Sequence, residues 1–399
     1  MSMLARLRRF WLDVHLWAGV GLLVPFVILG VTGSLLVWHD PLEKAFEPQR
    51  YAVSAGPALP LATHLTNARA AVGETFVVTA LRPASEAGEP VVAQARAKGR
   101  PAEGRRPETR SVWLDPASGR VLDTANPRAS AFGVMHVLHG SLMIPDIGRK
   151  VVGWMGWAML ASSLTGLWLW QPRNGALLKA LRWKRGPRTT FNLHHFTGFW
   201  LAIPLAVLSL TGVYISFPQS ARAVLGTFVA LPAEEQRGGG RGPNPFGGPP
   251  PLARTNLTID QAADAALGAA PGAMLVAINL PTGGRGDAAP SWRVQVRRAG
   301  AETPVNVQVS DETGEARVQG ERGPPNPATQ VARLMRRIHD GVDMGLPWQI
   351  IIFLGGWAPA VLGYTGIWMW LRRRAARRAV RRRIGAAEAG AAAASQAAE

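Results

Sequence analysis

Four long apolar segments stand out along the chain. They cover approximately residues 16–37, 151–170, 196–217 and 348–370, and none of them contains a charged side chain. An α-helix needs about 20 apolar residues to cross the hydrocarbon core of a bilayer. Buried helices of soluble proteins are shorter and usually keep a polar stripe. The pattern therefore predicts an integral membrane protein with four transmembrane helices.

The apolar segments belong to an internal repeat. VHLWAGVGLLVPFVILGVTG, from Val14, matches LHHFTGFWLAIPLAVLSLTG, from Leu193, without a gap, so that His15 corresponds to His194. The sequence around the second segment matches that around the fourth in the same way and places His139 on His339. We therefore expect two tandem copies of one unit, and in repeat-built membrane proteins the functional site usually lies where the repeats meet.

Basic residues flank these segments on one side. Arginines precede the first segment, arginines and lysines fill the loop between the second and third, and RRRAARRAVRRR follows the fourth. The positive-inside rule places all three stretches and both termini in the cytoplasm. The first segment is too long for a signal peptide and lacks a cleavage site, so we expect a retained anchor. The formal net charge of +18 could also indicate nucleic acid, but membrane lipids already account for arginines beside a span, and we expect no nucleic-acid partner.

These features divide the chain into nine segments. They are a cytoplasmic N-terminus at 1–10, a first span at 11–38, a first outer module at 39–148, a second span at 149–171, a basic cytoplasmic loop at 172–190, a third span at 191–217, a second outer module at 218–345, a fourth span at 346–371, and a basic, then alanine-rich, cytoplasmic tail at 372–399. The low-complexity tail beyond Ile384 predicts disorder.

Each outer module is predicted to be a small α+β fold. In the first, residues 61–73 have the pattern of a helix, and residues 75–83 and 109–123 have the patterns of strands. In the second, a helix near 257–272 has Thr258 or Asp260 as a candidate cap, and three stretches of alternating residues follow it.

The histidines are the candidate chemistry. The chain has no cysteine and eight histidines, which excludes disulfides, thiolate iron–sulfur clusters and covalently attached c-type haem. His15 and His194 lie at the cytoplasmic ends of their spans, and His139 and His339 precede their spans on the other side. About 36 Å of helix separates His15 from the far face. One pair at each face is the arrangement that a transmembrane electron relay requires, although packing by small residues would also explain the glycines near them.

Two sets of motifs carry a resemblance to known proteins. The D-x-x-x-G-x-V hairpin at Asp115–Val121, with a similar one near Asp311–Val318, resembles the PepSY domain. The L-H-x-x-x-G spans with their T-G ends resemble the PepSY-associated transmembrane family, whose members include haem-containing ferric-siderophore reductases of the bacterial inner membrane. The resemblance covers nearly the whole ordered chain, and it implies periplasmic outer modules and non-covalent b-type haem.

The resemblance also implies a ligand set. The family motifs fall on His15 with His194 for an inner haem b, and on His139 with His339 for an outer haem b, each iron held by two imidazoles. His136 or His39 could replace His139, and His195 lies next to a motif histidine, so these substitutions stay open, as does one haem instead of two. His64 is expected on the surface of a helix in the first module.

The resulting hypothesis is a di-haem b reductase. It would pass electrons from an unknown cytoplasmic donor to a ferric siderophore or ferric chelate in the periplasm and release Fe(II) for iron uptake. One alternative is a non-enzymatic, membrane-anchored PepSY protein that binds or regulates a partner. The other is a siderophore or metal transporter, which the lack of charged residues in the spans disfavours.

Overall fold

The chain forms two compact units in the computed structural model, which describes residues 2–99, 107–172, 181–227, 250–282, 289–301, 304–319 and 327–396. The helical unit consists of Met1–Trp38, Met135–Val229 and Ala328–Glu399, and the sheet unit consists of His39–Val134 and Ala230–Pro327. Part of the predicted basic loop, residues 173–180, lies outside the described residues.

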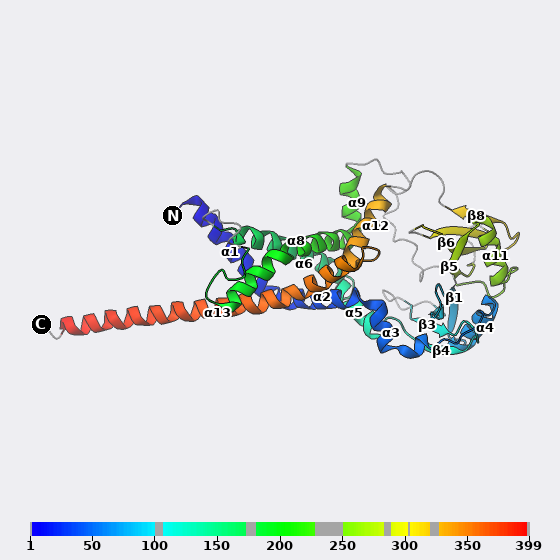
Figure 1. Cartoon of the computed structure of the whole chain (residues 1–399), viewed down its shortest axis with the longest axis horizontal. Helices are drawn as coiled ribbons and strands as arrows, with labels where there is room; N and C mark the ends of the chain where they lie inside the picture. The colour runs from blue at the N-terminus through cyan, green and yellow to red at the C-terminus, as the bar shows by residue number, and fades with distance from the viewer. Residues whose placement is uncertain are drawn as a thin grey trace. The chain divides into compact units, whose positions relative to one another are not determined.

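The helical unit is a bundle of long helices. Its elements are α1 (Met3–Gly21), α2 (Leu23–Leu36), α5 (Ala131–Ser141), α6 (Gly148–Trp170), α8 (Thr189–Ser216), α9 (Pro218–Gly226), α12 (Pro327–Asp340) and α13 (Leu346–Gln396). Within this unit α6 packs along α8, while α13 packs against both α2 and α8 (Figure 1).

Several of these helices have the length and composition of membrane spans. Thr189–Ser216 and the apolar part of α13 can each cross a membrane, and α1 with α2 gives a third span if the bent pair is counted as one. The chain therefore has the helices of a membrane protein, as predicted. α6 has 23 residues but is not among these candidates, so the fourth span stays a prediction.

The bend between α1 and α2 has a local cause. The two helices meet at Leu22 with an angle of 66°. Pro25 has no N–H with which to bond the carbonyl of Gly21, and its ring crowds that carbonyl. A bend thus accompanies Pro25, whereas Pro204 lies inside α8, which is one uninterrupted helix.

Small residues allow the helices to cross closely. Where α2 meets α13, a Cβ on Gly30 would collide with the carbonyl of Gly356, and Ser34 Oγ donates a hydrogen bond to the Phe353 carbonyl at 2.8 Å. Small side chains at such crossings let two backbones approach and gain dispersion contacts where no hydrophobic effect operates. This crossing holds the first and last long helices together.

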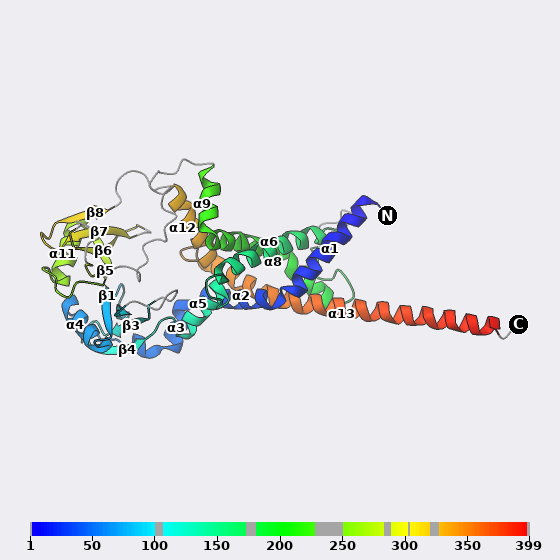
Figure 2. The same ribbon diagram turned by 180° about the vertical axis from the view of Figure 1, so that it is seen from behind.

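The C-terminal tail is helical, so the expectation of disorder beyond Ile384 is wrong. α13 continues without a break through the arginine-rich stretch to Gln396, and Figure 2 shows it running past the other helices of its unit. Alanine has the highest helix propensity. A helix that already exists also needs no new nucleus in order to extend.

The sheet unit contains one antiparallel sheet. Its elements are α3 (His39–Phe46), a short 3₁₀ helix η1 (Pro48–Tyr51), α4 (Leu61–Val72), β1 (Phe76–Arg82), β2 (Val91–Ala97), β3 (Thr109–Leu114), β4 (Val121–Ala125), α11 (Ile259–Ala269), β5 (Ala273–Asn279), β6 (Ser291–Arg298), β7 (Val305–Ser310) and β8 (Ala316–Gln319). The strand order is β4-β3-β2-β1-β5-β6-β7-β8. The sequence analysis missed β2, in which polar Gln94 and Arg96 dilute the apolar signal.

The two outer modules, which the sequence analysis treats separately, share this sheet. They join where β1 pairs with β5, with Leu81 opposite Ile278, and the Leu280 N–H donates to the Thr79 carbonyl at 2.9 Å. β1 and β5 each carry an irregularity, at Val78/Ala80 and at Leu275/Ala277. α4 and α11 pack on one face over a common core that includes Leu81, Ile278 and Trp292. The halves therefore fold as one unit.

A carboxylate ties the helices of the two halves together. Thr258 caps α11, as one of the two expectations had it, and Gln261 completes a capping box. Asp260, the other candidate, instead caps the neighbouring helix: its two oxygens accept hydrogen bonds from the Leu61 and Ala62 N–H groups at 2.7 and 3.0 Å. A cap on α4 is needed because Pro60, at its N-cap, offers no side-chain acceptor.

His64 lies inside the sheet unit, so its predicted surface position is wrong. Its side chain is fully buried between α4 and the sheet, and neither ring nitrogen has a hydrogen-bond partner. Burial lowers the pKa of His64 below its ordinary value of 6.5, because an imidazolium ion would lose its hydration there. The imidazole therefore fills the core as a neutral ring.

Candidate functional site

Four histidines of the helical unit each contact a threonine that precedes a glycine. The distances from histidine Nδ1 to threonine Oγ1 are 3.2 Å for His15 and Thr165, 3.2 Å for His139 and Thr32, 2.9 Å for His194 and Thr365, and 3.0 Å for His339 and Thr211. In every case the partner is on another helix of the same predicted repeat. These are the four histidines that the sequence analysis selected.

The partners decide which ring nitrogen carries the proton. The Nδ1 atoms of His139, His339 and His194 also lie 2.9, 3.1 and 3.1 Å from the main-chain carbonyls of Leu29, Leu208 and Leu362. A carbonyl oxygen only accepts a hydrogen bond, so Nδ1 must donate. Nε2 of each neutral ring therefore keeps its lone pair.

The threonines fit the same assignment. Each threonine hydroxyl donates to a carbonyl one turn earlier in its own helix, as Thr365 does to Val361 at 2.7 Å and Thr165 does to Ala161 at 2.7 Å. Its oxygen is then left to accept from the histidine. For His15 this threonine contact defines the tautomer.

Glycine makes room for each imidazole. A Cβ placed on Gly33 would lie 2.8 Å from Cε1 of His139, and one on Gly212 would lie 3.1 Å from Cε1 of His339. The corresponding values are 3.0 Å at Gly166 for His15 and 3.5 Å at Gly366 for His194. Each Thr-Gly pair thus supplies an acceptor and a bare patch of helix for one ring to lie against.

His139 and His339 face one another. Their ring centres are 6.0 Å apart, with an angle of 47° between the planes. His139 comes from α5 and is anchored to α2, whereas His339 comes from α12 and is anchored to α8. Two imidazoles bound to opposite sides of one metal by bonds of about 2 Å would have centres about 6 Å apart. This pair therefore fits a metal held by two nitrogens.

His15 and His194 form the second pair of histidines. The two pairs, His139 with His339 and His15 with His194, are called the two levels of the site. His194 and Thr211 are separated by about 25 Å along α8, at the rise of an α-helix. A Cβ on Gly19, one turn after His15, would meet no atom within 4 Å, and one on Gly198 would meet only Leu362, at 3.7 Å. The space beside these two glycines is therefore open, as a flat ligand between helices would need.

The substitute ligands are placed less favourably. His39 belongs to the sheet unit, where it contacts Asp40 at 2.9 Å and packs on Phe132. His136 is exposed on α5, and His195 packs on Phe191 with ring centres 4.1 Å apart. Among the described residues no group of three or more potential metal ligands occurs, so pairs of histidines are the candidate sites.

Sequence reasoning missed the role of the threonines. The signal was present, because a Thr-Gly pair recurs in all four apolar segments. A repeated pair of small residues in a membrane helix is commonly explained by helix packing, and the spacing along one helix does not reveal which histidine of another helix meets it. The contact is defined only by the folded bundle.

The four histidines and their threonines all lie within the region that a family model matches. The model of the PepSY-associated TM region matches residues 12–373. The chain belongs to this family. The matched region of this PepSY-associated protein begins within α1 and ends within α13, so it spans both units. A comparison with curated proteins gives no match.

Proposed function

We propose that this PepSY-associated protein is a membrane reductase that carries two b-type haems. It passes electrons from the cytoplasmic side of the bacterial inner membrane to a ferric siderophore or another ferric chelate in the periplasm. The observation that carries the proposal is the set of four histidines whose Nδ1 atoms are held as donors, which leaves four Nε2 lone pairs in two levels of one bundle.

The residues fit this cofactor. A haem b bound between two imidazoles supplies a carrier for one electron. His139 and His339 approach each other at the separation that two axial ligands need. Ligating histidines commonly donate their second ring N–H to an acceptor, which fixes the ring and raises the basicity of the ligating nitrogen. The threonines and carbonyls do this here.

The proposal includes four spans and two tandem repeats. The basic end of the helical unit, with its arginines, would lie in the cytoplasm, and the sheet unit would lie in the periplasm. Each proposed repeat contributes one histidine to each level, and each histidine is held by a threonine of its own repeat. Two repeats facing each other therefore supply the two sides of each site.

The ligand preferences of iron explain why reduction would release it from a siderophore. Siderophores present hard oxygen atoms to Fe(III), and reduction to Fe(II) weakens their hold on the metal. The chain's own contribution is to hold the two levels of carrier at fixed positions within a water-poor bundle. The sheet unit would then offer a docking surface for the chelate, and the cytoplasmic donor is left unassigned.

The first test is a spectrum of the protein purified in detergent, before and after dithionite, with a pyridine haemochrome assay. We expect sharp α and β bands on reduction and about two haems b per chain. His139→Ala and His194→Ala should each lower the count to about one, whereas His136→Ala, a matched change of an exposed histidine on α5, should leave two.

A second test measures the reaction. Proteoliposomes that contain a reductant are given an external ferric chelate and an Fe(II)-specific dye. We expect Fe(II) outside the vesicles with the wild-type protein and little with His139→Ala. A protein that stays colourless after haem supplementation would contradict the proposal and favour a non-enzymatic PepSY binding protein. Uptake of intact chelate without reductant would instead favour a transporter.

A further inference from the structure

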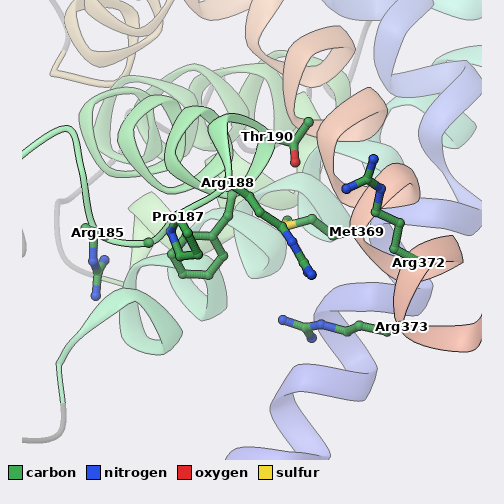
Figure 3. A pocket seen from close by; sticks show the side chains of 9 residues that line it. Arg185, Pro187, Arg188, Thr190, Met369, Arg372 and Arg373 are labelled. Carbon is green, nitrogen blue, oxygen red and sulfur yellow. The ribbon is translucent and has the colours of Figure 1, made fainter. Parts of the chain in front are cut away.

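The helical unit contains a basic pocket at the end where α8 begins. A cavity of about 200 Å³ lies between the loop before α8 and the part of α13 that follows its apolar stretch. Four arginines line it: Arg185, Arg188, Arg372 and Arg373. In Figure 3 the side chains of Arg188 and Arg373 extend toward one another from the two sides of the pocket.

The loop that carries two of these arginines is fixed. The buried Asn192 accepts hydrogen bonds from the Arg185 and Gly186 N–H groups at 3.0 and 2.9 Å and donates to the Gly186 carbonyl at 2.9 Å. One buried side chain thus folds the loop back onto the first turns of α8. The positions of the arginines are therefore set before any ligand arrives.

Arg185 is incompletely satisfied. Its Nη2 donates to the Trp170 carbonyl at 3.1 Å, and its guanidinium lies over the Trp170 ring at 5.0 Å. Its Nη1 is buried and has no hydrogen-bond partner. A buried donor without a partner costs free energy, more so when it belongs to a charged group.

The described lining of the pocket also offers no counter-charge to the arginines. Among the described side chains that line the cavity none is acidic, and the ion pairs that the structure shows elsewhere do not involve these four arginines. Like charges gathered around one cavity repel one another, although water weakens this repulsion at the exposed Arg188, Arg372 and Arg373. An anion in the cavity would convert this repulsion into attraction.

The chemistry of the pocket selects the kind of anion. Guanidinium groups bind phosphate through paired N–H donors, and several of them match the several oxygens and higher charge of a phosphate better than the single charge of a carboxylate. Phe191 and Met369 add an apolar wall for the group that the phosphate carries. We propose that this pocket is a binding site for a phosphate group.

Two sources could supply such a phosphate. The pocket begins at Met369, at the end of the apolar stretch of α13, which is the depth of the headgroups if α13 spans a bilayer. An anionic lipid could therefore place its headgroup there. A soluble phosphorylated molecule could enter from the water side. The site itself does not depend on the proposed reductase function.

The test uses the full chain in nanodiscs. In the soluble arm, inorganic phosphate is titrated by calorimetry into protein in phosphatidylcholine discs. In the lipid arm, native mass spectrometry counts the phosphatidylglycerol retained from mixed discs. The pocket variant is Arg188→Gln with Arg373→Gln, and the control is Arg377→Gln with Arg381→Gln, which removes equal charge from the exposed part of α13. Circular dichroism checks that both variants remain folded.

We expect binding in one arm that the pocket variant weakens by about tenfold or more and that the control leaves unchanged. The arm that responds identifies the source of the phosphate. No binding in either arm, or equal loss in both variants, would overturn the proposal. Phosphate binding that appears only after haem extraction would also overturn it, since the pocket would then serve the cofactor's own carboxylates. The haem spectrum tests the reductase proposal separately.

Discussion

The helical unit and the sheet unit each contain residues from both halves of the repeat that the sequence predicts, but corresponding positions differ in how far they are alike. In the helical unit both halves keep the same contact, a histidine that donates to a threonine beside a glycine. In the sheet unit the halves have diverged. Buried His64 on α4 stands where α11 has a buried alanine, Ala262, and Asp260 on α11 stands where α4 has Ala62.

This difference between the two units indicates what the similarity of the halves contributes in each of them. A cofactor held between two equivalent ligands requires both halves to keep the same residue, because the loss of either ligand empties the site. A sheet requires only that both halves present complementary backbone and apolar faces, so its side chains are free to specialise. Asp260 illustrates this freedom, since it caps a helix of the other half. Under the proposed function, the similarity of the halves in the helical unit serves the two equivalent ligands of a haem, whereas in the sheet unit it serves strand pairing and core packing.

The largest effect should follow from breaking the contact in the helical unit. Gly33→Ala places a methyl group 2.8 Å from Cε1 of His139, closer than van der Waals contact permits, so the ring must move. We expect the haem count per chain to fall from about two to about one. Gly140→Ala, beside His139 but facing open space, is the matched control. A Gly33→Ala protein that retains two haems would show that this contact does not position the ligand.

A smaller effect should follow from removing the contact between the halves of the sheet unit. Asp260→Ala deprives α4 of its only described cap, and caps of this kind are worth about 1–2 kcal/mol. Asp264→Ala, an exposed carboxylate on the same helix, should change the free energy of unfolding by much less. Urea unfolding of the full chain, followed by pulsed hydrogen exchange in β5 to β7, measures both. Equal changes in the free energy of unfolding for the two variants would mean that the loss of a negative charge, and not the loss of the cap on α4, destabilises the protein.

The smallest effect concerns pH. The folded state holds His64 with a lowered pKa, so below pH 6.5 the unfolded state binds more protons, and stability falls as the pH decreases. His64→Leu should flatten this dependence between about pH 6.5 and 5 when unfolding of β5 to β7 is measured as before. An unchanged slope would mean that His64 has the same pKa in the folded and unfolded states.

Asp115 provides an internal control for that measurement. Burial alone would raise the pKa of its carboxyl, but hydrogen bonds from Ser118, Ser54 and Ala117 outweigh burial and bring the pKa to about 2, below its ordinary value of 3.8. The ionised form thus stabilises the fold. This contribution is lost as the pH falls from about 4 toward 2, so it is separated from the His64 effect, which is measured between about pH 6.5 and 5.

The sequence predicts which histidines are equivalent but not what they contact. His15, His194, His139 and His339 were selected because histidine is rare in the chain and the apolar repeats align without gaps, and the structure gives all four the same kind of threonine contact. Their role as ligands stays a prediction. Their threonine partners, on other helices, could not be assigned from spacing along one chain. The same limit applies to Asp260. Its position at the start of α11 suggests a cap on that helix, but its partner, the Leu61 N–H, is nearly 200 residues away in the sequence.

The misses in the fold have related causes. Strand β2 was overlooked because polar Gln94 and Arg96 weaken the apolar pattern, and only pairing with β1 and β3 makes it a strand. His64 was placed on the surface because a histidine in an amphipathic helix is usually solvated, whereas here its side chain is fully buried. The tail was expected to be disordered from its composition alone. Its connection to an existing helix, which composition does not describe, reverses that expectation.

The joint between β1 and β5 has a consequence for how such a chain can arise. Leu81 lies opposite Ile278, and these two residues occupy equivalent positions in β1 and β5. Two identical strands related by a two-fold axis would pair in the same way. A polypeptide of half this length could form the same sheet as a homodimer. Duplication and fusion of its gene would then join the two halves in one chain. In a homodimer every substitution occurs in both subunits, whereas in the fused chain each half can change independently.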